Sequence, residues 1–148
     1  MNNLFLLSLS LLLCIVACGE NAEGEQAVNE TAYEKAFAAK YSNAKDVDWR
    51  MDDNGYHEAH FKIDGDKYRA DFDDDGNWRE TERSMDYGDL PDAVKETIKE
   101  QYDKDDIEEI ELVDSSSKGT FYDVEFKDDG KKWDVEINKE GKIIGVVE

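Results

Sequence analysis

Histidine, cysteine and proline are scarce in this chain, and basic residues are far fewer than acidic ones. Of 148 residues, 18 are Lys or Arg and 38 are Asp or Glu, so the formal net charge is −20 at pH 7. This charge argues against nucleic acid as a ligand, because proteins that bind it are basic, and against close contact with an anionic membrane surface. It is compatible with cationic partners, with divalent ions or simply with solubility.

The two cysteines, Cys14 and Cys18, both lie near the start of the chain. Residues 4–17 form an uncharged apolar run, shorter than the ~20 residues that span a bilayer and typical of a secretory signal. The run ends in Ile15-Val16-Ala17-Cys18, which looks like the bacterial lipobox, although Met1-Asn2-Asn3 lacks the usual basic residue. Cleavage before Cys18 would place a lipid there, remove Cys14 and leave no disulfide. The alternative is a buried N-terminal helix with a chance cysteine.

These features divide the chain into four segments. We expect a lipoprotein signal peptide at 1–17, an acidic tether at 18–30, a first repeat at 31–88 and a second repeat at 89–148. The tether is expected to be flexible, because it has four glutamates, no basic residue and no apolar periodicity. The expected location is a membrane-anchored lipoprotein that faces the periplasm or the cell surface, with the outer membrane favoured.

An internal repeat dominates the rest of the sequence. Residues 61–78 and 126–143 align at a constant spacing, so that Phe61 corresponds to Phe126 and Gly76 corresponds to Gly141. Both copies alternate apolar and polar residues between glycine turns, the pattern of antiparallel strands joined by hairpins.

A helix is predicted before each set of strands. Thr31 and Glu34 have the spacing of a capping box, and Pro91 suits the first turn of the second helix. The apolar stripes of the two helices are Tyr33, Phe37 and Tyr41, and Val94, Ile98 and Tyr102. The predicted fold class is α+β: a tandem repeat of a helix followed by a four-stranded antiparallel sheet, with the helices on one face.

Alternation assigns the strand residues to two faces. The helix-covered face is predicted to carry Trp49, Met51, Ala59, Phe61, Ile63, Tyr68, Ala70, Phe72, Ile110, Leu112, Val124, Phe126, Trp133, Val135 and Ile137. The opposite face is the candidate partner-binding surface, with Arg50, Tyr56, Glu58, His60, Arg69, Phe121, Asp123 and Glu125. Tyr56 and Phe121 occupy matching positions and are the predicted hot spots. The alternative is a merely solvated face.

A calcium-loop pattern is present in residues 71–82. Asp71, Asp73, Asp75 and Glu82 have the spacing of an EF-hand loop. The flanking residues alternate as strands where a helix is required, so we expect an acidic hairpin turn and at most weak divalent-cation binding. His57 and His60 would point to opposite faces of a strand and so not share a metal.

The segments 41–49, 55–82, 90–102 and 119–143 resemble the putative beta-lactamase-inhibitor-like, PepSY-like family of secreted proteins and lipoproteins. The family usually has a Tyr-Pro turn after each helix, where this chain has Tyr41-Ser42 and Tyr102-Asp103. The resemblance implies a fold like the beta-lactamase inhibitor protein, and it supplies no catalytic residue.

We therefore expect a lipid-anchored envelope module for binding or inhibition, not an enzyme and without a cofactor, that presents its open sheet face to an unidentified protein partner. No serine lies in a recognisable nucleophile setting. The alternative function is an acidic envelope lipoprotein that binds cations such as Ca²⁺.

Lipidation predicts the behaviour of one variant. Cys18→Ser removes the thiol that would carry the lipid, so the protein should move from the membrane fraction to the soluble fraction when cells are lysed and fractionated. A Cys18→Ser protein that still sediments with membranes would contradict the anchor.

Overall fold

The computed structural model describes residues 30–147, so the predicted signal peptide, Cys18 and nearly all of the tether lie outside the described residues. Two helices, two short 3₁₀ turns and eight strands follow in the order α1 (Ala32–Lys40), β1 (Lys45–Met51), β2 (His57–Ile63), β3 (Asp66–Phe72), β4 (Trp78–Ser84), η1 (Tyr87–Asp89), α2 (Asp92–Gln101), η2 (Lys104–Asp106), β5 (Ile107–Ser115), β6 (Gly119–Asp128), β7 (Lys131–Ile137) and β8 (Ile143–Val147). Within residues 30–147, no helix has the length and apolarity needed to cross a membrane.

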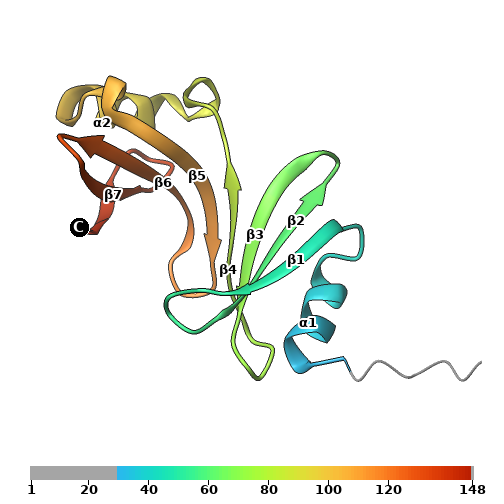
Figure 1. Ribbon diagram of the computed structural model, residues 1–148. Coiled ribbons are helices and arrows are strands. Elements are labelled where there is room, and N and C mark those ends of the chain that lie inside the picture. The colour runs from blue at the N-terminus through green and yellow to red at the C-terminus, as the bar shows by residue number, and fades with distance from the viewer. Residues whose placement is uncertain (1–29, 148) are drawn as a thin grey trace, which may run out of the picture.

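The strands form one antiparallel sheet of eight strands in sequence order, so each strand pairs with the next along the chain. The predicted tandem arrangement is confirmed: each helix precedes four strands, and the two units join where β4 pairs with β5, from Glu80 opposite Ser115 to Ser84 opposite Glu111. The sheet curves strongly, and α1 and α2 lie over its two ends (Figure 1). The joined units therefore share one continuous sheet.

The helices begin where local chemistry favours it. The Thr31 side chain accepts a hydrogen bond from the Glu34 backbone N–H, and the Glu34 carboxylate accepts one from the Thr31 N–H at 2.8 Å, which completes the predicted capping box. Pro91 stands immediately before α2, where its missing N–H costs no helix hydrogen bond.

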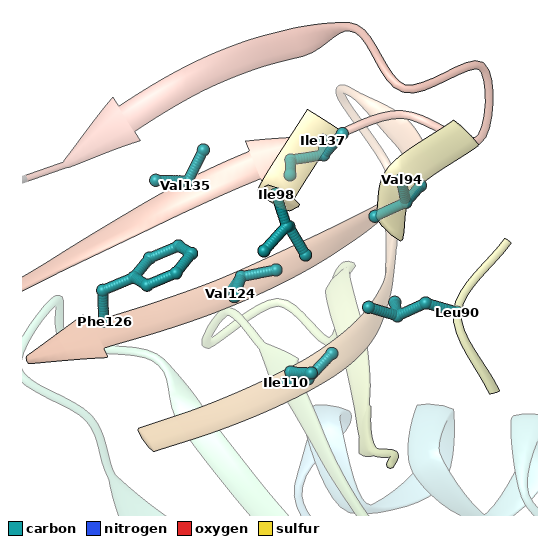
Figure 2. Close-up of a cluster of buried hydrophobic side chains, with 8 residues drawn as sticks. All are labelled: Leu90, Val94, Ile98, Ile110, Val124, Phe126, Val135 and Ile137. Atoms are coloured by element: carbon teal, nitrogen blue, oxygen red, sulfur yellow. The ribbon is translucent and has the colours of Figure 1, made fainter. Parts of the chain in front are cut away.

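Each helix packs on the sheet through its predicted stripe. Under α1 the cluster is aromatic, and the Phe37 ring stands edge-on to Phe61 at 5.0 Å between centroids. Under α2 it is mainly aliphatic, with Val94 and Ile98 pointing onto the strand residues (Figure 2). Both clusters lie on the same side of the sheet, as predicted. Met51 lies opposite His57 and so on the predicted face, but it ends the edge strand β1 and is 59% exposed rather than buried.

The same turn-to-helix contact occurs in both units. Gly76 and Gly141 sit in hairpin turns with φ of 82° and 81°. A Cβ on Gly76 would lie 2.7 Å from the carbonyl oxygen of Ala32, and one on Gly141 would lie 2.6 Å from that of Ala93. Glycine is therefore needed twice over at each turn, for its backbone conformation and for the close approach of the helix.

The two cores predict matched losses of stability. Phe61→Ala and Phe126→Ala should each lower the free energy of unfolding by about 3 to 5 kcal/mol, because each removes a buried ring and leaves a cavity. Met51→Ala is the control, and its exposed side chain should change the free energy by less than about 0.5 kcal/mol. Urea denaturation measures all three, and a loss under about 1 kcal/mol at either phenylalanine would contradict the packing.

Candidate functional site

The face of the sheet opposite the helices, here called the open face, is formed mainly by charged side chains. Residues directly opposite each other in an antiparallel sheet share a face. The register therefore places on it Glu58, His60, Arg69, Asp71, Glu80, Glu82, Glu111, Val113, Phe121, Asp123, Glu125, Asp134 and Glu136. Of the predicted partner-binding residues, Glu58, His60, Arg69, Phe121, Asp123 and Glu125 belong to this set.

The other two predicted residues lie at the margin of the open face. Arg50 is opposite Glu58 on the edge strand β1 and is exposed, with its Nε 3.1 Å from Asp48. Tyr56 precedes β2 and is half-buried, and the Arg79 guanidinium lies 5.2 Å from its ring centroid.

Arg69 connects the two units across the open face. Its Nε donates a hydrogen bond to the Glu82 carboxylate at 2.7 Å, and its Nη2 donates one to Glu111 of the second unit. Glu58 lies 4.0 Å from the same guanidinium and also contacts His60. Sequence reasoning did not find Glu111, because its contact with Arg69 depends on how β4 and β5 pair.

A hollow of about 410 Å³ lies beside this guanidinium. Its lining includes the imidazole of His60 and the charged side chains of Lys67, Arg69, Glu82, Glu109 and Glu111. Burial raises the pKa of the Glu111 carboxyl, the Glu82 carboxylate adds to the rise, and Arg69 opposes it. The hollow is thus a polar depression with both signs of charge on its walls.

Carboxylates face each other on neighbouring strands in both units. Glu58 is directly opposite Asp71, and Asp123 is directly opposite Glu136. These two pairs, called the acid pairs below, occupy corresponding positions in the two copies of the repeat. Like charges placed opposite each other destabilise a sheet. Each acid pair has a further carboxylate on the next strand: Glu80 lies opposite Asp71, and Glu111 lies opposite Asp123.

One member of each acid pair is buried. Asp71 is 9% exposed, and Glu136, at the corresponding position, is 7% exposed. Glu136 accepts a hydrogen bond from the Lys118 ammonium. Among the described residues, Oδ1 of Asp71 and Oδ1 of Asp123 are buried without any hydrogen-bond partner. A buried acceptor that lacks a partner costs free energy, so the acid pairs do not serve the stability of the sheet.

The environment of the acid pairs shifts their titration. Burial raises the pKa of Asp71 to about 7, and the carboxylates of Glu58 and Glu82 add to the rise. Burial raises the pKa of Asp123 to about 7 as well, with further contributions from Asp134 and Glu136. Both carboxyl groups therefore change charge near neutral pH.

The predicted exposure of Phe121 is wrong. Phe121 lies on the open face as expected, but it is only 3% exposed. It stands opposite Val113, and the Lys118 ammonium lies 5.5 Å from its ring centroid. Alternation gives the face on which a side chain lies, whereas its depth depends on the neighbours that cover it. Phe121 is thus part of the floor of the open face.

The four residues of the calcium-loop pattern are separated by the fold. The Asp73 carboxylate accepts hydrogen bonds from the backbone N–H groups of Asn77 and Asp75, at 2.8 Å and 3.1 Å, and so closes a hairpin turn. Asp71 points to the open face, and Glu82 is bound to Arg69. Between residues 30 and 147, no three His, Cys, Asp or Glu side chains are grouped so that they could hold a metal ion.

The two histidines lie on opposite faces of β2. His57 stacks on Tyr33 of α1 at 3.7 Å between ring centroids and contacts Asp74 at 2.8 Å. His60 lies on the open face against Glu58. They do not converge on a common site.

Comparison with known proteins identifies a matching family model and solved structures with a similar fold. The model of the family described as "Putative beta-lactamase-inhibitor-like, PepSY-like" matches residues 54–145. A BLIP-like protein from Bacteroides fragilis shares 24% sequence identity over 78% of this chain and 82% of its own, with a TM-score of 0.67. A protein from Bacteroides eggerthii described as a putative periplasmic protein shares 17% identity over 78% of this chain and 85% of its own, with a TM-score of 0.68. No curated protein matches the chain.

The raised pKa values predict how stability depends on pH. The folded protein binds protons on Asp71 and Asp123 more tightly than the unfolded chain, in which the ordinary pKa is 3.8. Their stabilising contribution is therefore complete below pH 4 and is lost as the pH rises through about 7. The free energy of unfolding of the wild type should fall more between about pH 5 and pH 8 than that of the Asp71→Asn, Asp123→Asn double variant. Urea titrations at both pH values measure this difference, and identical pH dependence in the two proteins would contradict it.

Proposed function

Because the chain belongs to the putative beta-lactamase-inhibitor-like, PepSY-like family, we propose that it is a non-catalytic module of the cell envelope that binds a protein partner through its open face. The module is inhibitory if its partner is an enzyme. The name of the family points to beta-lactamases, but that link rests on a shared fold, and function resides in the site rather than in the fold.

The observation that carries this proposal is that the two faces of the sheet differ: one is covered by helices and the other is not. The helix-covered face holds both hydrophobic clusters. The open face is left to the solvent, and its side chains are fixed by cross-strand ion pairs such as Arg69 with Glu82. A surface whose side chains are already held in place loses little conformational entropy on binding, which favours affinity.

The first thirty residues support a location in the envelope. The lipobox-like Ile15-Val16-Ala17-Cys18 predicts a lipid on Cys18, and the similar protein from Bacteroides eggerthii is described as a "putative periplasmic" protein. Residues 18–30 would then act as a tether between the membrane and the first helix. In this arrangement the lipid holds the protein to the outer membrane while the acidic sheet stays in the aqueous phase.

The calcium-binding alternative gains no support from the described geometry. Asp73 is engaged in its own turn and Glu82 is bound to Arg69, so the oxygens of the pattern do not converge as a Ca²⁺ site requires.

Site-specific photo-crosslinking tests which face meets the partner. A photoreactive phenylalanine analogue replaces Lys67 or Lys132, both exposed on the open face, or Lys99 or Glu100, both exposed on α2. Illumination of the cells that produce the protein should give a discrete adduct of one mass from the two open-face positions and none from the helix positions. Adducts from the helix positions alone, or from none of the four, would overturn the proposal.

A further inference from the structure

The acid pairs are retained in both units despite their cost to the sheet. In each pair two carboxylates stand directly opposite each other, and one of them, Asp71 or Glu136, is at least nine-tenths buried. A feature that breaks a local rule of stability, and does so twice at corresponding positions, is expected at a functional site. The chemistry that relieves two crowded carboxylates is a positive charge.

Lys118 shows how the second unit already accommodates a cation. It comes from the turn between β5 and β6, and its ammonium donates a hydrogen bond to Glu136. The same ammonium lies 5.5 Å from the centroid of the Phe121 ring. A primary ammonium thus sits between a buried carboxylate and an aromatic ring, which is a favourable setting for a cation.

The first unit has no corresponding lysine. Its hairpin between β1 and β2 is shorter, with Asp52, Asp53 and Asn54 where the second unit has the turn that bears Lys118. Asp71, which corresponds to Glu136, has Oδ1 buried without a partner. The carboxylates that raise its pKa are Glu58 from β2, Glu80 and Glu82 from β4, and Asp52 from the preceding turn. Arg69, on the same face, donates its hydrogen bonds to Glu82 and Glu111. Within residues 30–147, Asp71 therefore has acidic neighbours and no ion pair with a basic side chain.

Resting on the proposed function, we infer that the open face recognises a basic segment of its protein partner, and that one Lys or Arg side chain of this segment binds Asp71 while a second binds Asp123. Oδ1 of each of these two carboxylates is buried and has no hydrogen-bond partner, so a cation docked on the open face would balance charge that hydrogen bonds within the chain leave uncompensated. They lie on β3 and β6 of the one continuous sheet, so the segment crosses the strands and spans the junction of the two units.

A divalent metal fits these acids less well than an organic cation. Ca²⁺ needs six to eight oxygens that converge on one point, and no group of three ligating side chains within residues 30–147 does so. An ammonium or guanidinium group needs only one or two carboxylates and gains from a nearby aromatic ring, which is the setting that Lys118 has. The net charge of −20 would also attract a basic partner from a distance.

Two variants of equal charge separate a specific site from general attraction. Asp71→Asn with Asp123→Asn changes the acid pairs without changing their shape. Glu96→Gln with Glu100→Gln removes the same charge from the exposed side of α2. The amides also remove repulsion, so the melting temperature of the first variant should not fall below that of the wild type.

The probe is a fluorescein-labelled hexa-arginine peptide, titrated with the mature chain from Cys18 onward at low ionic strength and followed by fluorescence anisotropy. The titration is run at about pH 9, where Asp71 and Asp123 are ionised despite their raised pKa and the two variants remove equal charge. The open-face variant should bind the peptide at least about tenfold more weakly than the wild type, because each lost contact is a charge-assisted hydrogen bond. The helix variant should stay within about twofold, as expected for exposed charges. Equal weakening in both variants would overturn the inference, as would tight one-to-one Ca²⁺ binding that Asp71→Asn abolishes.

The photo-crosslinking experiment distinguishes this inference from the proposed function. If the open-face adduct forms in the wild type and persists undiminished in the Asp71→Asn, Asp123→Asn variant, the basic segment is wrong while the binding module stands. If no adduct forms from any position but the peptide still distinguishes the two variants, the acid pairs are a cation site and the proposed function is wrong.

Discussion

The pairing of β4 with β5 is the interaction on which the rest of the structure depends. Each unit of a helix and four strands has about sixty residues, a size at which a domain buries only about 60% of its unfolded surface and is marginal alone. The pairing runs from Glu80 and Ser115 to Ser84 and Glu111, and it turns two small sheets into one. The Arg69 guanidinium strengthens the same junction, because it binds Glu82 on one side and Glu111 on the other. A continuous open face is the direct consequence.

In our proposal, stability and recognition are assigned to opposite sides of this sheet. The aromatic cluster under α1 and the mainly aliphatic cluster under α2 bury the apolar side chains, and their burial supplies the driving force for folding. The open face contributes little to this hydrophobic burial and holds opposed carboxylates that destabilise a sheet. The burial of Asp71 and Glu136 and the unpartnered Oδ1 of Asp123 are costs that the hydrophobic side of the sheet offsets.

Much of the fold follows from the sequence, because repeats, alternation and helix caps are local signals. They predicted the tandem α+β architecture, the stripes around Phe37 and Ile98, and the face on which Glu58 and Arg69 lie. These signals failed where a prediction depends on strand register or on how deeply a side chain is buried. The Lys118 ammonium lies over the ring of Phe121, and Met51 is exposed at the end of the edge strand β1. The alternation of apolar and polar residues predicts neither the burial of Phe121 nor the exposure of Met51. The contact of Arg69 with Glu111 joins residues of different units, so it depends on how β4 pairs with β5. The missing hydrogen-bond partner of Asp71 likewise depends on which side chains the neighbouring strands place around it. The sequence of this chain does not identify the partner, because it determines only the charge and shape of the surface that the partner must match.

We propose that the open face binds its partner through the acid pairs. Nuclear magnetic resonance of the ¹³C-labelled and ¹⁵N-labelled mature chain during titration with hexa-arginine tests this proposal most directly, because it reports every residue at once. We expect the carboxyl carbons of Asp71 and Asp123 and the amides of β3 and β6 to shift most, while the signals of α1 and α2 remain unchanged. Shifts spread evenly over the exposed acids of both faces, or concentrated on the helices, would contradict it.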